Sequence, residues 1–308
     1  SKNAVPILLE GLASLEYRGY DSASIAVQNS AGPLEITKSA GRVEALVKAV
    51  GENPPIGNTG IGHTRWATHG LVNEGNAHPH TSCDGKIAII HNGIVENHVG
   101  LRDELSDAGH EFSSETDSEV IAHLVEDRVE AGASLEEALR LTAGRIHGAN
   151  AVVVTSTSEP GVIIGLRLGN AGGIVVGLSD SGNVMASDLL AVLPHTDRVV
   201  YLASGEMANL SPDSVRFTSV DGGQVQKEPF ITDITAASAD KGEFPHFMLK
   251  EIFEQPEAVS SAVRGRVNFD AGAISLPEFP FDQSEVEAID QVILVGMGTS
   301  LHSGMLGA

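Results

Sequence analysis

The sequence predicts an α+β fold, in which helices and antiparallel strands form separate layers. Hydrophobic residues make up 42% of the 308-residue chain, which is enough to bury sizeable cores and excludes a mainly disordered chain. Helical spacing is grouped in the first half, and short β-rich runs separated by turn clusters are grouped after residue 150. Because a parallel sheet requires strands and helices that alternate, this grouping favours antiparallel hairpins packed against helices.

The elements of the first half follow from the spacing of apolar residues. A helix is expected from Pro6 to Leu15, where apolar side chains recur every three or four residues. Two later helices begin with capping-box spacing, at Thr116 with Glu119 and at Ser134 with Glu137. The expected strands lie at residues 24–28, 34–38, 59–64 and 86–91, and the expected helices at 43–50, 95–108, 117–130 and 134–146.

The elements of the second half are short β-rich runs. Turn clusters such as residues 158–161 and 179–183 separate them, which indicates antiparallel hairpins. The expected strands lie at residues 151–155, 162–166, 173–177, 183–186, 198–202 and 214–219.

The chain is expected to contain a first domain at residues 1–230, a linker with helices at 231–287, and the start of an α/β domain at 288–308. Helical spacing returns from His246 to Val263. Residues 292–295 predict a β-branched strand that leads into a glycine-rich turn, as at the opening of many α/β domains. Because the chain starts within its first predicted helix and stops just after this turn, the sequence predicts a fragment.

The formal net charge of the chain is −22 and its isoelectric point is about 4.8. Such a surface repels phosphate backbones and anionic lipids, so we expect no nucleic-acid partner and no membrane partner. No apolar run reaches the ~18 residues of a membrane span and no signal-like start is present, which predicts a cytoplasmic protein. The single cysteine, Cys83, excludes an intrachain disulfide and argues against a cysteine-based zinc site.

Polar residues are densest between residues 62 and 93, which hold five of the 12 histidines. A metal site is one interpretation, but metal-binding histidines usually come with a carboxylate or thiolate, and here Arg, Trp and Asn surround them. We therefore expect no metal, and neutral, hydrogen-bonded imidazoles in most of the set. Those histidines are His63, His69, His78, His80 and His91.

Other residues of this region allow two interpretations each. Arg65 has a guanidinium suited to a carboxylate and Trp66 could cover a pocket, or the two could form a surface ion pair with a stacked ring. Asn92 and Gly93 could supply two donors to an oxyanion, or could form a turn. Asp117 could bind a ligand or cap a helix.

Five motifs occur in order along the first half of the chain. Together they resemble the glutaminase domain of the glutamine:fructose-6-phosphate aminotransferase family, which belongs to the class II glutamine amidotransferases. Weaker matches at residues 186–188, 247–256 and 298–300 extend the resemblance over essentially the whole chain. The five motifs lie at Leu15 to Ser22, His63 to Gly70, Asn76 to His80, His91 to Asn97 and Glu115 to Glu119.

The resemblance implies an αββα sandwich of the N-terminal-nucleophile hydrolase type, followed by the start of a sugar-isomerase domain. It implies hydrolysis of L-glutamine, with the released ammonia used to convert fructose 6-phosphate into glucosamine 6-phosphate. No cofactor is implied, and the family resemblance implies a homodimer formed through the isomerase domain. An amidotransferase with another acceptor, and a paralogue that only binds or senses its ligand, remain alternatives.

The resemblance also assigns roles to residues. Asn92 and the Gly93 N–H would form the oxyanion hole. The glutamine-binding residues would be Arg65 for the α-carboxylate, Asp117 with the Gly93 region for the α-ammonium, Thr68 and His69 near the carboxylate, and Trp66 at the ammonia channel. Arg18 would lie close to the nucleophile. Gly298, Thr299 and Ser300 would bind the sugar phosphate.

The family nucleophile is an N-terminal cysteine, which the chain does not contain. Cys83 lies in a loop and has no neighbouring base with triad-like spacing in the sequence. We therefore expect Cys83 to be a structural or incidental thiol, and this chain to be inactive on its own.

Overall fold

The computed structural model describes residues 3–28, 32–67, 70–212, 214–234, 244–263, 266–268, 272–274, 281, 283–296 and 298–307. The chain divides into two compact units, residues 1–240 and 241–308. All strand pairs in the described residues are antiparallel, as the turn-separated runs predict.

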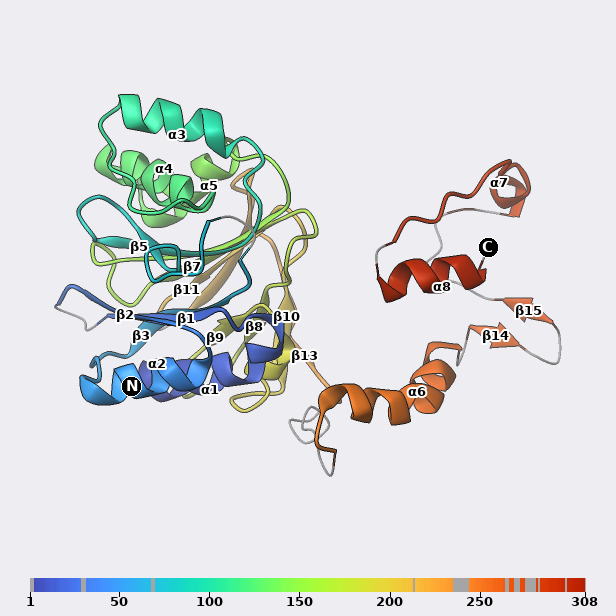
Figure 1. Cartoon of the computed structure of the whole chain (residues 1–308). Helices are drawn as coiled ribbons and strands as arrows, with labels where there is room; N and C mark the ends of the chain where they lie inside the picture. The colour runs from blue at the N-terminus through green and yellow to red at the C-terminus, as the bar shows by residue number, and fades with distance from the viewer. Residues whose placement is uncertain are drawn as a thin grey trace. The chain divides into compact units, whose positions relative to one another are not determined.

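A three-stranded sheet in the order β2-β1-β3 forms one inner layer of the first unit. Two helices cover its outer face (Figure 1) and bury Leu12 and Leu46 against Ile25. Strand β3 is an edge strand of this sheet among the described residues. The elements are α1 (Ala4–Leu15), β1 (Ser22–Gln28), β2 (Leu34–Ala40), α2 (Val43–Glu52) and β3 (Thr59–Arg65), with the 3₁₀ turn η1 (Glu16–Arg18) after α1.

A six-stranded sheet in the order β12-β11-β7-β6-β5-β4 forms the second inner layer. Helices α3, α4 and α5 cover its outer face (Figure 1), and the largest hydrophobic core lies between these helices and the sheet. The strands are β4 (His80–Thr81), β5 (Ile87–Gly93), β6 (Asn150–Ser156), β7 (Ile163–Leu168), β11 (Glu206–Leu210) and β12 (Val215–Ser219). The helices are α3 (His98–Asp107), α4 (Glu119–Glu130) and α5 (Leu135–Ala143).

A smaller sheet in the order β13-β10-β8-β9 completes the first unit. Val176 and Val200 of this sheet share a buried cluster with Ala208 of the six-stranded sheet. The elements are β8 (Val175–Gly177), β9 (Val184–Ala186), the 3₁₀ turn η2 (Leu189–Ala191), β10 (Arg198–Tyr201) and β13 (Phe230–Ile231). Helices outside and sheets inside make an αββα sandwich, which confirms the predicted fold class.

Two expectations about helix starts in the first unit differ from the structure. Helix α1 begins at Ala4 and not at Pro6, because the Asn3 side chain caps it by accepting a hydrogen bond from the Val5 N–H at 3.1 Å. Thr116 does not cap α4, whose N-cap position is Ser118. The Glu119 carboxylate instead accepts hydrogen bonds from the N–H groups of Ser113 and Ser114, so Thr116 and Glu119 do not form a capping box. Ser134 does cap α5, as predicted.

The second unit contains α6 (Phe247–Val263), β14 (Val267–Asn268), β15 (Ala273–Ile274), α7 (Gln283–Glu287) and α8 (Thr299–Gly307). The predicted strand at residues 292–295 is wrong: these residues form no strand, and Val295 is 92% exposed. An apolar β-branched run forms a strand only beside a partner, and none pairs with it among the described residues.

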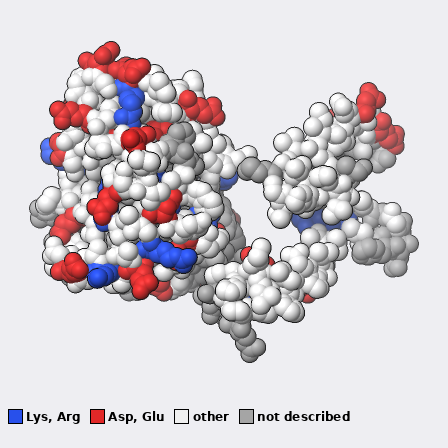
Figure 2. Space-filling view, viewed as in Figure 1, with Lys and Arg blue, Asp and Glu red and all other residues white. Residues whose placement is uncertain are grey.

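Acidic side chains are spread over the visible face of the first unit, with isolated Lys and Arg side chains between them (Figure 2). Among the residues that the structure describes, no helix has both the length and the apolar character that a membrane span requires.

Candidate functional site

A cavity of about 1120 Å³ lies within the first unit. Residues 58–66, which include all of β3, line it together with α1, the end of β5 and the start of α4. Five of the predicted site residues reach this one cavity from three segments of the chain: Arg65, Trp66, Asn92, Gly93 and Asp117. Arg18 lines it as well.

Arg65 is a buried residue at the end of β3, with an exposed fraction of 4%. Its guanidinium donates to the carbonyls of Leu71 at 3.1 Å and Gly70 at 3.4 Å. These bonds hold the positive charge at the cavity wall. The surface-ion-pair interpretation of Arg65 is therefore wrong, because the side chain is buried.

Trp66 follows Arg65 and is 61% exposed. Its indole meets the Tyr20 ring edge to face, with 5.6 Å between the ring centroids. The backbone turn below it is fixed by Asp21, whose carboxylate accepts a hydrogen bond from the Ala67 N–H at 2.5 Å. Trp66 therefore stands at the mouth of the cavity on a backbone held from beneath.

Asn92 has a defined amide orientation. Its Oδ1 lies 3.1 Å from His63 Nε2, and a carbonyl oxygen can only accept, so His63 donates from Nε2. The Asn92 Nδ2 group is thereby left as the donor end of the amide. Sequence reasoning did not identify His63 as the residue that orients Asn92, because 29 positions separate the two.

Gly93 ends β5 with φ of +133°, a value that side chains disfavour. A Cβ at this position would collide with the Ala149 carbonyl oxygen. Glycine is therefore required here by both backbone conformation and space. It brings the main chain next to Asn92 without a side chain between the backbone and the cavity.

Asp117 is buried, with an exposed fraction of 3%, and it is not the cap of α4. Its Oδ2 accepts a hydrogen bond from the Val95 N–H at 2.8 Å, which ties the start of α4 to the segment after β5. The carboxylate lines the same cavity as Arg65. A negative and a positive group are thus both available to one ligand.

The half-buried His63 and the buried His78, His80 and His91 are called the cavity histidines below. Burial lowers the pKa of His63 to about 4, and burial also lowers the pKa values of the other three. At neutral pH all four are therefore uncharged.

The predicted hydrogen bonds of the cavity histidines are confirmed for three of them. His80 Nε2 lies 3.0 Å from Thr116 Oγ1, and His91 bridges Ser118 and Asn150, each at 2.9 Å. His78 differs, because both of its ring nitrogens are buried without a hydrogen-bond partner among the described residues. Its ring instead packs against His63 in a tilted arrangement and against His80 edge to face, with centroids 4.2 and 4.6 Å away.

The remaining predicted residues lie elsewhere. Arg18 pairs with Asp188 at 3.1 Å and lies at the rim of the cavity. Thr68 and His69 fall outside the described residues. Gly298, Thr299 and Ser300 lie in the second unit, where Gly298 has φ of +61° and directly precedes α8.

The fold brings two histidines to Cys83, although no base with triad-like spacing neighbours it in the sequence. Its Sγ lies 3.5 Å from His110 Nδ1 and 3.6 Å from His123 Nδ1. Both histidines are far from Cys83 in the sequence, so local spacing could not reveal them. Cys83 does not line the cavity.

A family model described as "Glutamine amidotransferase domain" matches residues 55–210. The glutamine–fructose-6-phosphate aminotransferase (isomerizing) of Thermus thermophilus is 44% identical over 306 residues, which cover 99% of this chain and 49% of that protein. The enzyme of the same name from Pseudomonas aeruginosa is 43% identical with the same coverage. The chain thus spans about half the length of the curated relatives it matches.

A solved glutamine phosphoribosylpyrophosphate amidotransferase from B. subtilis is similar in fold, with a TM-score of 0.60 and 24% identity over 71% of this chain and 47% of that one. Its likeness supports the sandwich architecture alone. The family model covers half of the chain and includes β3, β5 and the start of α4, which line the cavity. The chain therefore belongs to the glutamine amidotransferase family.

Proposed function

We propose that the first unit binds L-glutamine in the cavity and hydrolyses its side-chain amide. We further propose that the whole protein transfers the ammonia to fructose 6-phosphate and forms glucosamine 6-phosphate, in keeping with the relatives, which are glutamine–fructose-6-phosphate aminotransferases. The observation that carries the proposal is the pairing of an oriented amide donor, Asn92, with the opposite charges of Arg65 and Asp117 around one cavity.

The two charged residues suit the free amino acid. Glutamine carries an α-carboxylate and an α-ammonium at a fixed distance from the amide to be cleaved. In our proposal Arg65 binds the carboxylate through its two-pronged guanidinium, and Asp117 accepts hydrogen bonds from the ammonium. Trp66 covers the entrance, and Arg18, Thr68 and His69 support the pocket.

The oxyanion donors suit acyl transfer. When a thiolate attacks the amide carbon, negative charge develops on the amide oxygen. Asn92 Nδ2 and the Gly93 N–H would stabilise that charge, and the fixed orientation of Asn92 means that little reorganisation is needed. The amide nitrogen takes up a proton and leaves as ammonia, and water then hydrolyses the thioester to glutamate.

The nucleophile in this proposal is a cysteine on a segment that precedes residue 1 in the full-length protein. The cavity runs along the whole of β3, which is an edge strand among the described residues, and an edge strand can pair with a further strand. Cys83 is outside this cavity. Full-length protein should release ammonia from glutamine, and replacement of the upstream cysteine by alanine should abolish this release.

The control for that experiment is Cys83→Ala in the full-length protein, which should retain glutaminase activity. Ammonia release that survives loss of the upstream cysteine and disappears in Cys83→Ala would overturn the proposal. The residues 1–308 alone should release no ammonia.

The sugar phosphate would bind at the start of α8. Gly298 has a positive φ, and the N–H groups of a helix start can hold a phosphate. We propose that Gly298, Thr299 and Ser300 contribute to this site, and that residues 288–308 begin the isomerase domain. A homodimer formed through that domain and a cytoplasmic location belong to the same proposal.

A further inference from the structure

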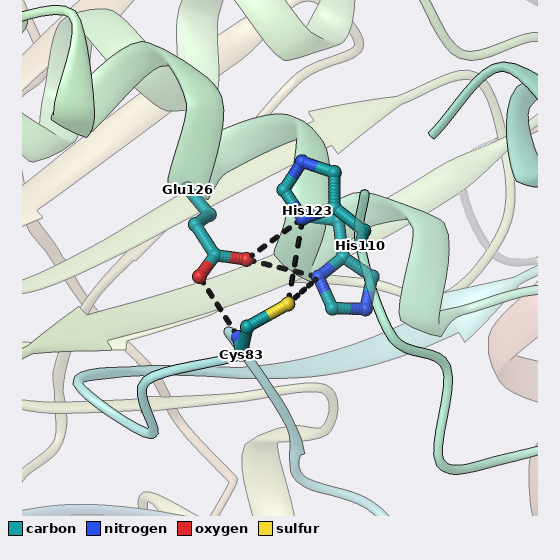
Figure 3. Close-up of side chains that lie close together, drawn as sticks. All are labelled: Cys83, His110, His123 and Glu126. Carbon is teal, nitrogen blue, oxygen red and sulfur yellow. Dashed lines mark hydrogen bonds and ion pairs between the residues drawn. The ribbon is translucent and has the colours of Figure 1, made fainter. Parts of the chain in front are cut away.

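A second polar cluster lies on the opposite side of the six-stranded sheet from the glutamine cavity. We call it the Cys83 cluster, and it consists of Cys83, His110, His123 and Glu126 (Figure 3). Cys83 belongs to the turn between β4 and β5, His110 follows α3, and the other two lie one helical turn apart on α4. Three segments of the chain thus bring one sulfur, two imidazoles and one carboxylate together, with their ligand atoms within 4.8 Å of one another.

The distances match the edges of a coordination tetrahedron. Zn–N bonds of about 2.0 Å and Zn–S bonds of about 2.3 Å place a sulfur and a nitrogen roughly 3.5 Å apart, and a nitrogen and an oxygen roughly 3.3 Å apart. In the structure Sγ lies 3.5 and 3.6 Å from the two Nδ1 atoms. Glu126 Oε2 lies 3.2 Å from His110 Nδ1 and 2.9 Å from His123 Nδ1.

The protonation pattern leaves electron pairs that face one another. His110 Nε2 lies 2.9 Å from Asp127 Oδ1, and a carboxylate can only accept, so Nε2 carries the proton. In neutral His110 the Nδ1 atom then presents a bare electron pair to Glu126 Oε2, which is an acceptor as well. A cation between these groups would bind both electron pairs.

Further hydrogen bonds to the ligand residues orient their ligand atoms, as they do around many metal ions. Asp127 binds the far nitrogen of His110, which is the carboxylate–histidine arrangement typical of zinc sites. Glu126 Oε1 accepts a hydrogen bond from the Cys83 N–H at 2.8 Å, so Oε2 turns to the centre of the cluster. His123 and Glu126 are 1% and 5% exposed, whereas Cys83 is exposed and offers an entry path.

We propose that the Cys83 cluster is a structural binding site for a divalent zinc-like cation. Four protein ligands with tetrahedral spacing are typical of structural zinc, whereas catalytic zinc keeps an open position. The ion would displace the proton of the Cys83 thiol and the proton that His123 Nδ1 donates to Glu126 Oε2, so that neutral His123 would carry its proton on Nε2. The thiolate, two neutral imidazoles and one carboxylate would then hold the ion. It would fasten the β4–β5 turn and the segment after α3 to helix α4.

Two features argue against a catalytic thiol at this position. Burial and the nearby Glu126 carboxylate raise the pKa of the Cys83 thiol, whereas a nucleophilic cysteine has a lowered pKa. A bound cation would supply the positive charge that the thiolate lacks here. Zinc accepts thiolate, imidazole and carboxylate ligands, so a single cysteine is sufficient for a mixed site.

The test uses the 308-residue chain, stripped with a chelator and titrated with Zn²⁺ alone or Co²⁺ alone. We expect one ion per chain, a rise in the thermal midpoint of roughly 5–15 °C at saturating Zn²⁺, and tetrahedral d–d bands with a thiolate-to-cobalt band for Co²⁺. Zn²⁺ should also protect Cys83 from alkylation.

Matched variants make the result specific. Cys83→Ser and Glu126→Gln should lose the cobalt spectrum, and Asp127→Asn, which is partly exposed, should weaken zinc binding by roughly 10- to 100-fold because it orients a ligand. His147→Gln, an exposed histidine outside the cluster, should bind like the parent chain. Circular dichroism establishes that each variant is folded.

Three results would overturn the proposal: no stoichiometric binding at micromolar Zn²⁺, a cobalt spectrum unchanged in Cys83→Ser, or equal zinc affinity in Asp127→Asn and the parent chain. Rapid alkylation of Cys83 regardless of Zn²⁺ would indicate a reactive thiol instead. None of these readouts depends on glutamine hydrolysis, so the cation site and the proposed function can fail separately.

Discussion

Two groups of histidines in the first unit differ in their hydrogen-bond partners. Three of the cavity histidines, His63, His80 and His91, bond to neutral groups, namely Asn92, Thr116, Ser118 and Asn150. In the Cys83 cluster His110 and His123 instead face the carboxylates of Glu126 and Asp127. Histidine content alone therefore does not decide what a site binds. Burial keeps the cavity imidazoles uncharged, whereas the carboxylates at the Cys83 cluster provide the negative charge that a cation requires.

The largest expected effect comes from removing a charge at the cavity. Replacing the buried Arg65 by Ala should weaken glutamine binding by about 2–5 kcal/mol, because Arg65 neutralises the ligand's carboxylate in a desolvated site. Calorimetric titration of the 308-residue chain measures this change. A glutamine derivative with an amide in place of the α-carboxylate is the control ligand. If the substitution weakens both ligands equally, Arg65 does not bind the carboxylate.

As the pH is lowered, the free energy of unfolding should respond first to the cavity histidines, and only at lower pH to the carboxylates. The pKa of His63 is about 4 in the folded chain and 6.5 otherwise, so the unfolded state binds more protons between these values. The free energy of unfolding should therefore fall by roughly 3 kcal/mol as pH decreases from 6.5 to 4, and the other cavity histidines act in the same direction.

The control for this pH dependence is His63→Gln, which can still donate to Asn92 but does not titrate. Its stability should vary less between pH 6.5 and pH 4 than that of the parent chain. The Glu119 carboxylate should contribute to the pH dependence of stability mainly below pH 4.5. Burial raises its pKa, but hydrogen bonds from Ser113 and Ser114 hold the pKa low. Equal slopes in the two proteins would mean that His63 is not buried as a neutral residue.

A smaller effect is expected from the neutral partners themselves. Ser118→Ala removes the hydroxyl that binds His91 Nδ1 at 2.9 Å and leaves a buried acceptor unpaired. Such a loss typically costs about 1–3 kcal/mol of stability. Chemical denaturation measures the change, with the exposed Ser106→Ala as the matched control, for which about 0.5 kcal/mol or less is expected. Indistinguishable variants would argue against the assigned bond.

The smallest effect is expected at the rim. Arg18 and Asp188 form a partly exposed pair, with side chains 39% and 26% exposed. Arg18→Gln should change the free energy of unfolding by less than about 1 kcal/mol, and added salt should reduce the difference further. A larger loss of stability that does not depend on salt would mean that Arg18 is a structural residue. It would contradict the supporting role proposed for Arg18 at the cavity.

Much of the fold could be predicted because apolar spacing is a local signal. Strands β1, β2, β3 and β5 and helices α1, α2, α4 and α5 lie within a few residues of their predicted bounds. Strand β11 was missed because residues 206–210 form a short strand without strict alternation, and residues 292–295 form no strand because strand formation needs a partner that local sequence does not specify.

The site was predictable only through the motifs that resemble a known family. Physical reasoning left Asn92 as a turn residue or a donor, and the choice depends on His63, which only the fold brings to 3.1 Å. The Cys83 cluster was missed for the same reason. Its members are contributed by three segments, and no local spacing relates Cys83 to His110.

The central claim is that Asn92, oriented by His63, donates to the oxyanion of glutamine hydrolysis. Single-turnover hydrolysis by full-length protein tests it most directly, with Asn92→Ala compared with the parent. The account predicts a rate roughly 10²- to 10³-fold lower, with glutamine affinity little changed. An unchanged rate per folded molecule, accompanied by a lowered thermal midpoint, would contradict it and would make Asn92 a structural residue of the turn.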